Sequence, residues 1–207
     1  MDNTEILFWN VDTQVDFVEP DGKLYVPGAE QLKPIWTAIT AFAAQQDIRV
    51  VNTADFHYKN SLELSDTPDF ITTFPEHCMA HTRGAAFVSA TIPDNPVVYR
   101  WDKAYDSLQE VLKHRNIVIC KDAFDVFSGN PYTDRIVEML APSVIVVYGV
   151  TTNVCVNDAV IGLAQRGKKV YVIDEAIKEL PNIPLPFKKW ETLGVERCSF
   201  EALKLKK

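Results

Sequence analysis

The stretch SVIVVYGVTTNVCVNDAVIGLA, Ser143 to Ala164, decides the fold because it contains a strand, a turn and the start of a helix. The apolar run Ser143–Tyr148 has the length and composition of a buried strand. Gly149 and the polar residues after it are typical of a turn, and small and apolar residues then predict a helix to about Arg166. Cys155 falls in the first turn of this helix, where free N–H groups and the helix dipole stabilise a thiolate or an oxyanion. The alternative is a small buried hydrophobic residue, which is the commonest role of a free cysteine.

Further apolar runs alternate with helical patterns along the whole chain. We expect strands at Ile6–Val11, Ile48–Thr53, Val97–Arg100, Ile117–Cys120, Lys169–Ile173 and near Val195–Cys198. Helices are predicted over Ala29–Gln46, Tyr105–His114 and Tyr132–Leu140, whereas Thr13–Phe17 is expected to be a loop. This alternation predicts an α/β fold, doubly wound, with a mainly parallel sheet and helices on both faces. We expect one domain spanning residues 1–207, with an irregular segment at about 55–87 that covers a functional site.

The bulk properties narrow the classes of partner and location. The net charge of −7 argues against nucleic acid or an anionic membrane surface as a partner. No apolar run approaches 18 residues, so no membrane-spanning segment is expected. The first residues, Met1–Glu5, lack the positive region of a signal peptide. The four cysteines have no CxxC spacing and are expected to be reduced thiols, which makes the cytoplasm the default location.

Chemically useful residues stand at the predicted strand ends. Asp12 and Lys121 each follow an apolar run, and the carboxyl ends of parallel strands share one edge of the sheet. We therefore expect both to converge on Cys155. A lysine lowers the pKa of a thiol and a carboxylate can carry its proton, which together favour acyl transfer through a thioester. The alternatives are a capping role for Asp12 and a solvated Lys121.

A second set consists of Asp55, His57 and His77. Residues i and i+2 of an extended segment point the same way, so Asp55 and His57 can share a metal that His77 completes. One carboxylate and two imidazoles suit Zn²⁺, Fe²⁺ or Mn²⁺. Glu63 or Asp66 could supply a further ligand. The alternative is a surface aspartate beside two unrelated histidines.

Five motifs in order carry a resemblance to a known family: Val11–Phe17, Ala54–His57, Phe74–Cys78, Lys121 and Gly149–Val156. Together they resemble the nicotinamidase and isochorismatase-like cysteine hydrolases, in particular the metal-containing nicotinamidase-type branch. The resemblance implies a three-layer α/β sandwich and a catalytic triad of Asp12, Lys121 and Cys155. It also implies a cis peptide at Val150–Thr151, and an oxyanion hole formed by the N–H groups of Thr151 and Cys155.

The resemblance also implies how a substrate is held. The metal, with zinc as the first expectation, would orient an aromatic ring, and the set Asp55, His57 and His77 would bind it. The substrate would be flanked by Phe17, Phe74, Phe127 and Val150. Members of the family are often oligomers, which extends the expectation of a homo-oligomer to this chain. Three departures concern the substrate: residues 78–87 differ from the common pattern, Asn153 stands where an acid is common in nicotinamidases, and the segment Tyr58–Phe74 is longer and different.

These observations predict a cysteine amidohydrolase that converts nicotinamide, or a related aromatic or heterocyclic amide, to the acid and ammonia. One alternative keeps the triad and changes the substrate to another small amide or an N-carbamoyl amine. Another is a non-catalytic binder of small molecules or metal on the same scaffold. The intact triad argues against the binder.

Overall fold

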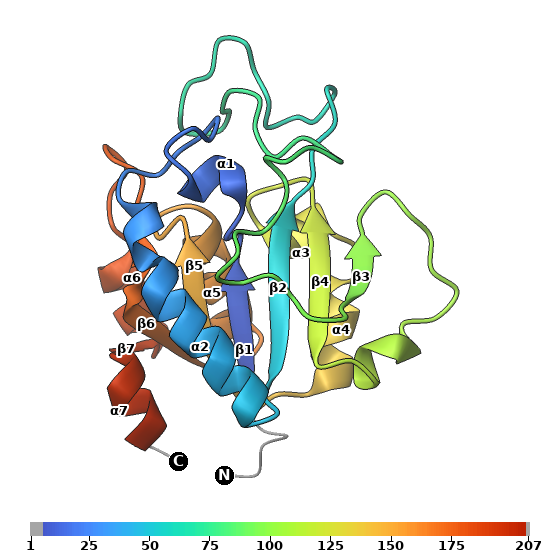
Figure 1. The fold of residues 1–207 in the computed structure, drawn as a ribbon, viewed down its shortest axis with the longest axis vertical. Helices are drawn as coiled ribbons and strands as arrows, with labels where there is room; N and C mark the ends of the chain where they lie inside the picture. Colours follow the sequence, from blue (N-terminus) through green and yellow to red (C-terminus); the bar gives the residue numbers. More distant parts are fainter. Residues whose placement is uncertain (1–5, 206–207) are drawn as a thin grey trace.

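A seven-stranded parallel sheet forms the centre of the computed structural model, which describes residues 6–205 (Figure 1). The central strand β1, Ile6–Val11, lies between β2, Arg49–Asp55, and β5, Val144–Val150. The full order is β3-β4-β2-β1-β5-β6-β7, where the other strands are β3 (Val97–Arg100), β4 (Asn116–Lys121), β6 (Lys169–Lys178) and β7 (Glu196–Cys198). The strand order reverses at β1, which places a topological switch point, the usual ligand site of such sheets, at its carboxyl end. The predicted doubly wound sheet is confirmed.

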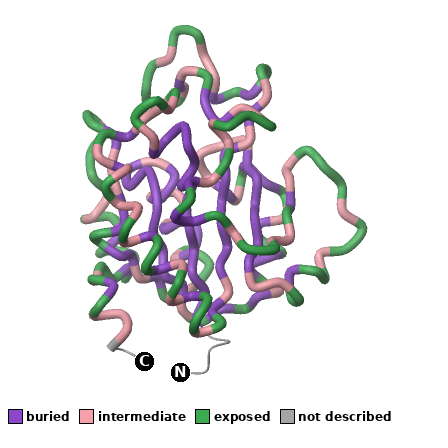
Figure 2. The backbone as a smooth tube through the Cα atoms, viewed as in Figure 1, coloured by how far each residue is buried: buried purple, intermediate pink, exposed green. Residues whose placement is uncertain are grey.

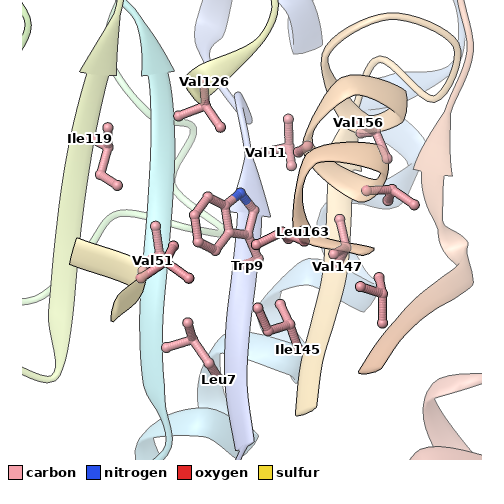
Figure 3. Close-up of a cluster of buried hydrophobic side chains, with 14 of the residues drawn as sticks. Leu7, Trp9, Val11, Val51, Ile119, Val126, Ile145, Val147, Val156 and Leu163 are labelled. Atoms are coloured by element: carbon pink, nitrogen blue, oxygen red, sulfur yellow. The ribbon is translucent and has the colours of Figure 1, made fainter. Parts of the chain in front are cut away.

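Alternate side chains of β1 enter two separate cores because neighbouring residues of a strand point to opposite faces. Leu7, Trp9 and Val11 pack under α5, Cys155–Gln165, and Figure 3 shows Trp9 at the centre of this cluster. Phe8 belongs to the core under α2, Lys33–Gln45. The remaining helical elements are α1 (Val15–Val18), α3 (Val126–Gly129), α4 (Thr133–Leu140), α6 (Phe187–Thr192), α7 (Phe200–Leu205) and two 3₁₀ helices, η1 (Ala29–Leu32) and η2 (Gln109–Leu112).

Three elements differ from their sequence-based predictions. Thr13–Phe17 is not all loop, because α1 begins at Val15 as a single helical turn. The predicted helix Tyr105–His114 is reduced to η2 because the Tyr105 hydroxyl accepts a hydrogen bond from the Arg100 N–H and its ring packs on Tyr99. These contacts hold Tyr105 against β3. Strand β6 continues beyond Ile173 to Lys178 through an irregularity in its pairing with β5.

Residues 56–87 form an irregular segment above the carboxyl ends of the strands, within the range 55–87 where the sequence predicts a cover (Figure 1). This segment contains no helix or extended strand, and its outer parts are exposed (Figure 2). Buried polar side chains tie it to the sheet. The Gln14 amide donates to the carbonyls of Asp55 and Ala85, and the Asp16 carboxylate accepts from the Cys78 N–H at 2.7 Å. Hydrogen bonds from the segment that follows β1 therefore hold the cover against the sheet.

Between residues 6 and 205, no helix has both the length and the apolar character that crossing a membrane requires.

Gly149 permits the closest approach between β5 and β1. Its φ is +124°, and a Cβ there would lie 2.1 Å from the Val11 carbonyl oxygen. We expect Gly149→Ala to lower the free energy of unfolding by about 3 kcal/mol or more, since backbone must move. Gly167→Ala is the control, because Gly167 also has a positive φ, +72°, but nothing lies within 4 Å of the added Cβ. That variant should lose only about 1–2 kcal/mol. Equal urea midpoints for the two variants would contradict this account.

Candidate active site

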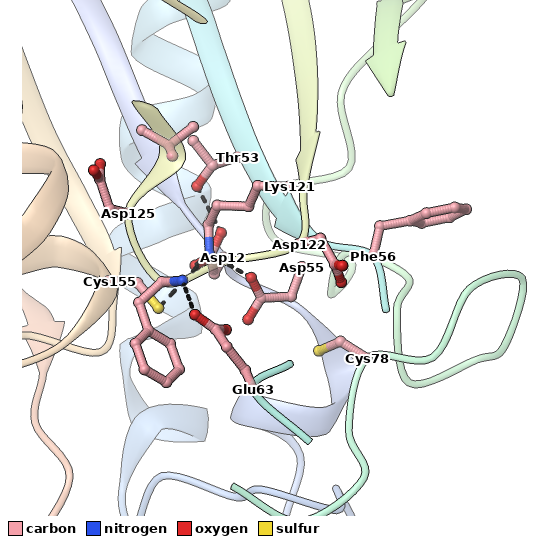
Figure 4. Close-up of polar contacts among 12 residues, drawn as sticks. Asp12, Thr53, Asp55, Phe56, Glu63, Cys78, Lys121, Asp122, Asp125 and Cys155 are labelled. Carbon is pink, nitrogen blue, oxygen red and sulfur yellow. Dashed lines mark hydrogen bonds and ion pairs between the residues drawn. The ribbon is translucent and has the colours of Figure 1, made fainter. Parts of the chain in front are cut away.

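Four strand ends bring the predicted triad and the first metal ligand together (Figure 4). Asp12 follows β1 directly, Asp55 and Lys121 are the last residues of β2 and β4, and Cys155 opens α5 after β5. The register of β2 and β4 pairs Asp55 with Lys121. All four residues are buried. Residues far apart in the sequence thus meet because the sheet is parallel.

The Lys121 ammonium is the centre of this group. Its Nζ lies 3.0 Å from Asp12 Oδ2 and 3.8 Å from Cys155 Sγ, and it also pairs with Asp55 Oδ1. Burial alone would lower the pKa of Lys121, but the carboxylates of Asp12 and Asp55 raise it well above its usual value. The lysine therefore stays charged and acts as a fixed positive charge beside the thiol.

The Asp12 carboxylate is held by one oxygen and available at the other. Oδ1 accepts a hydrogen bond from the Thr53 hydroxyl at 2.6 Å. Oδ2 is paired with Lys121 but accepts no hydrogen bond with suitable geometry. Burial raises the pKa of Asp12, and Lys121 opposes that rise. A carboxylate oxygen of Asp12 lies within 4.8 Å of Cys155 Sγ, so Asp12 can accept and return the thiol proton.

Cys155 is one of the residues that line a small pocket. Burial raises the pKa of its thiol well above the usual value, and Lys121 counteracts part of this. The raised pKa favours a resting thiol, which would have to lose its proton to act as a nucleophile. The Val150–Thr151 peptide is cis. Within residues 6–205, the N–H groups of Thr151 and Cys155 donate no hydrogen bond to the protein, which leaves both donors available to an oxyanion.

The metal set also meets as predicted from the motif spacing. Nε2 of His57 lies 3.8 Å and Nε2 of His77 lies 3.6 Å from Asp55 Oδ2. The outer nitrogens are already engaged: His57 Nδ1 bonds Asp122 Oδ1 at 2.7 Å, and His77 Nδ1 bonds the Pro75 carbonyl at 2.7 Å. Both Nε2 atoms consequently face the shared carboxylate.

Unpartnered atoms show that these residues fit a cation. Asp55 Oδ2 and His57 Nε2 are buried and have no hydrogen-bond partner, an arrangement that costs free energy unless something charged binds between them. Burial would raise the pKa of Asp55, yet Lys121 and the two histidines hold it well below its usual value. Burial would lower the pKa of His57, but Asp122 and Asp55 raise it to about 9. A divalent metal would replace the proton that this arrangement attracts.

Glu63 and Asp66, the two candidates for a fourth ligand, lie in different surroundings in the structure. Glu63 is buried, its Oε1 accepts a hydrogen bond from the Phe124 N–H at 2.5 Å, and its Oε2 has no partner. Burial raises the pKa of Glu63 to about 7. Asp66 is exposed and lines a different surface hollow with Lys59 and Glu76. Of the two, only Glu63 lies beside the triad (Figure 4).

Aromatic and aliphatic side chains enclose the pocket above Cys155. Its polar end contains Asp55, His77, Thr151 and Cys155, and its apolar walls are Phe17, Leu24, Phe74, Phe124, Val154 and Leu180. The Phe17 ring lies 5.3 Å from the His77 ring, and Phe74 packs edge-on against Phe124 at 5.4 Å. Phe17 and Phe74 are thus placed where the sequence predicts a substrate wall.

Phe127 and Val150 lie outside the pocket, contrary to their predicted placement. Phe127 lies in α3, stacks on Trp9 at 6.4 Å and carries the Arg166 guanidinium 3.5 Å above its ring. Gly162 of α5 makes room for it, because a Cβ there would lie 2.4 Å from the ring. Val150 is buried within β5. Phe124, which the sequence reasoning missed, occupies the wall instead.

Comparisons with known proteins show the family to which the chain is similar. Residues 6–182 match the model of the isochorismatase domain. The nicotinamidase/pyrazinamidase of Mycobacterium tuberculosis is 40% identical over 77 residues, which are 37% of this chain. The match spans 40% of that relative's length.

Two solved structures share the fold. The pyrazinamidase of Pyrococcus horikoshii in complex with zinc aligns with a TM-score of 0.72 and 20% identity, over 95% of this chain and 99% of that one. The N-carbamoylsarcosine amidase of Thermoplasma acidophilum aligns with a TM-score of 0.71 and 19% identity, over 94% and 96%.

The raised pKa of Glu63 predicts a pH dependence of stability in metal-free protein. In the folded state Glu63 holds its proton up to a pKa of about 7, above the value of 4.5 for the free side chain. Between these values the folded state binds more protons than the unfolded state, so stability falls as pH rises. Relative to Glu63→Gln, the wild type should lose a few kcal/mol between pH 5 and 8, at about 1.4 kcal/mol per pKa unit. Urea unfolding of both proteins across this pH range measures the difference. The prediction would be wrong if the free energies of unfolding of the two proteins changed with pH in parallel.

Proposed function

The chain belongs to the isochorismatase family, and we propose that it is a metal-containing cysteine amidohydrolase that cleaves nicotinamide or a related aromatic or heterocyclic amide. The observation that carries this proposal is Lys121, whose ammonium contacts Asp12, Asp55 and Cys155 at once. A buried charge with three such partners suits a nucleophilic thiol better than a structural role. The overall reaction adds water to the amide and releases the carboxylic acid and ammonia.

The chemistry begins at Cys155. Its sulfur attacks the amide carbonyl carbon while Asp12 Oδ2 accepts the thiol proton. The N–H groups of Thr151 and Cys155 stabilise the oxyanion of the tetrahedral intermediate. Asp12 then returns the proton to the leaving nitrogen, the C–N bond breaks, and ammonia departs from a thioester on Cys155.

Hydrolysis of the thioester uses the same groups in reverse. Asp12 removes a proton from water, whose oxygen attacks the thioester carbonyl, and the C–S bond breaks. The proton passes back to the sulfur, so the thiol is regenerated and the acid is released. Throughout both halves Lys121 keeps its charge and balances the negative charge on Asp12 and the sulfur.

The metal would be held by Asp55, His57 and His77, with Glu63 as a further candidate ligand. When bound, it supplies a Lewis acid that orients the ring of the substrate through a lone pair. Zinc is our first expectation, because the donor set suits it and because the archaeal pyrazinamidase was solved with zinc. Iron and manganese remain compatible with two imidazoles and a carboxylate. The apolar walls of Phe17, Phe74 and Phe124 match a flat ring.

The first test measures ammonia release from nicotinamide and pyrazinamide. We expect Cys155→Ala to lower kcat by at least about 10³-fold, since the nucleophile is lost. Cys198→Ala is the matched control and should keep wild-type activity, because Cys198 lies in β7 at the sheet edge. An acyl adduct on Cys155 should appear by mass spectrometry after acid quenching. Full turnover by Cys155→Ala would refute the mechanism, and turnover of N-carbamoyl amines alone would favour the alternative substrate class.

The second test concerns the metal. Asp122→Asn should weaken binding of Zn²⁺ about 10–100-fold, because Asp122 orients the His57 ring. Asp125→Asn is the control, since Asp125 caps α3 and accepts from the Phe127 N–H instead. Competition with a chromophoric chelator gives the affinities directly. Chelation of the wild type should also abolish ammonia release, and addition of Zn²⁺, Fe²⁺ or Mn²⁺ identifies the ion that restores it. Unchanged activity after complete chelation would exclude the metal from the reaction.

A further inference from the structure

We propose that Asn153 is a positioning residue that determines substrate specificity by fixing the Leu180 wall of the pocket. This inference rests on the proposed amidase function and assigns a role to a residue outside the triad and the metal set. Asn153 lies two residues before Cys155 and is 8% exposed. Its side chain points away from the chemistry and reaches the segment that follows β6.

Three hydrogen bonds join Asn153 to that segment. Its Nδ2 donates to the Leu180 carbonyl at 2.8 Å and to the Ile183 carbonyl at 2.9 Å. Its Oδ1 accepts from the Leu180 N–H at 3.0 Å. One amide therefore satisfies both backbone polar groups of Leu180 and a further carbonyl three residues on.

Leu180 and Ile183 also pack against the core under α2, but the clamped segment has few other hydrogen bonds. Residues 179–186 include prolines at 181, 184 and 186, which have no N–H to donate, and they form neither helix nor strand. Asn182 has a φ of 66°, which reverses the chain between Leu180 and Ile183. Among the described residues, no other hydrogen bond of the Leu180 backbone is present. Asn153 consequently provides the hydrogen bonds that hold the backbone of Leu180.

Leu180 in turn lines the pocket beside Val154 and Cys155. Because Asn153 precedes the nucleophile in the same turn, the clamp ties the wall directly to the reacting sulfur. A fixed wall admits flat single-ring amides and excludes wider ones. A released wall would admit wider rings and hold small rings less well. The clamp thus acts on binding more than on bond breaking.

The chemistry of the clamp requires an amide. An aspartate at 153 could still accept from the Leu180 N–H, but it has no donor for the two carbonyls. Its second oxygen would then lie against the carbonyl oxygens of Leu180 and Ile183, which is repulsive. Asn153→Asp therefore breaks the two hydrogen bonds to the carbonyls with almost no change in side-chain volume, which makes it the most selective variant for a test.

The experiment compares the wild type with Asn153→Asp and Leu180→Ala. We expect both variants to raise KM for nicotinamide about tenfold with kcat within about threefold. In Asn153→Asp this is the equivalent of one or two lost hydrogen bonds, and in Leu180→Ala it follows from the lost apolar contact with the ring. Both should improve kcat/KM for the bicyclic quinoline-3-carboxamide relative to nicotinamide.

Asn157→Asp is the matched control. Asn157 lies in α5, four residues after Asn153, and its side chain accepts from Trp190 and donates to Asp158 instead of holding the Leu180 backbone. The KM ratio of the Asn157→Asp variant should therefore equal that of the wild type.

A readout independent of hydrolysis separates this inference from the proposed function. Alkylation of Cys155 is followed by mass spectrometry with iodoacetamide and with the wider N-benzyl iodoacetamide. Asn153→Asp should raise the rate ratio of the wide to the narrow reagent at least about threefold, and hydrogen exchange at residues 179–183 should become faster.

If the wild type cleaves no amide but the alkylation ratio shifts, the proposed function fails and the clamp stands. If the alkylation ratio and the KM ratios in Asn153→Asp both equal the wild-type values, the clamp is refuted. A loss of kcat alone, with unchanged ratios, would also refute it and would assign Asn153 to the support of Cys155.

Discussion

The site depends on one buried ammonium. Lys121 is 1% exposed and would be unstable there without the carboxylates of Asp12 and Asp55. The two carboxylates would in turn repel one another without Lys121. Each group therefore makes the burial of the others tolerable, and the thiol of Cys155 lies within reach of the resulting charge. The parallel sheet supplies the geometry, because four strand ends fix these positions before any substrate arrives.

Two segments around this charge cluster hold the cover and one wall of the pocket in place. The segment after β1 holds the cover through Gln14 and Asp16, so the candidate metal ligand His77 is placed by residues close to Asp12 in sequence. The segment after β6 supplies an apolar wall that is tied back to the nucleophile turn by Asn153. The predicted triad thus lies at the ends of strands and the start of α5, whereas the cover and the segment after β6 shape the pocket.

The sequence predicted the parts that follow from periodicity and strand ends. Asp12, Lys121 and Cys155 converge because parallel strands end on one edge, and Asp55 and His57 share a side because they are two residues apart. The family membership inferred from the five motifs is confirmed by the domain match. Phe127 was misplaced because the short helix α3 turns it into the core and leaves Phe124, three residues earlier, at the pocket.

Other details have no periodic signal. Glu63 and Asp66 lie in a segment without repeating pattern, so burial of the first and exposure of the second follow only from tertiary contacts. The bond between Asn153 and Leu180 joins residues 27 positions apart, one in a turn and one in an irregular segment. Side chains that act through another segment's backbone leave little trace in composition or spacing.

Asp55 has a wider consequence, because its two oxygens serve different neighbours. Oδ1 pairs with Lys121, which also contacts Cys155, while Oδ2 faces both histidines of the candidate metal set. A substitution of Asp55 would therefore disturb the candidate metal set and the surroundings of the thiol together. A substitution of His57 or His77 would leave the contacts of Lys121 with Asp12 and Cys155 in place.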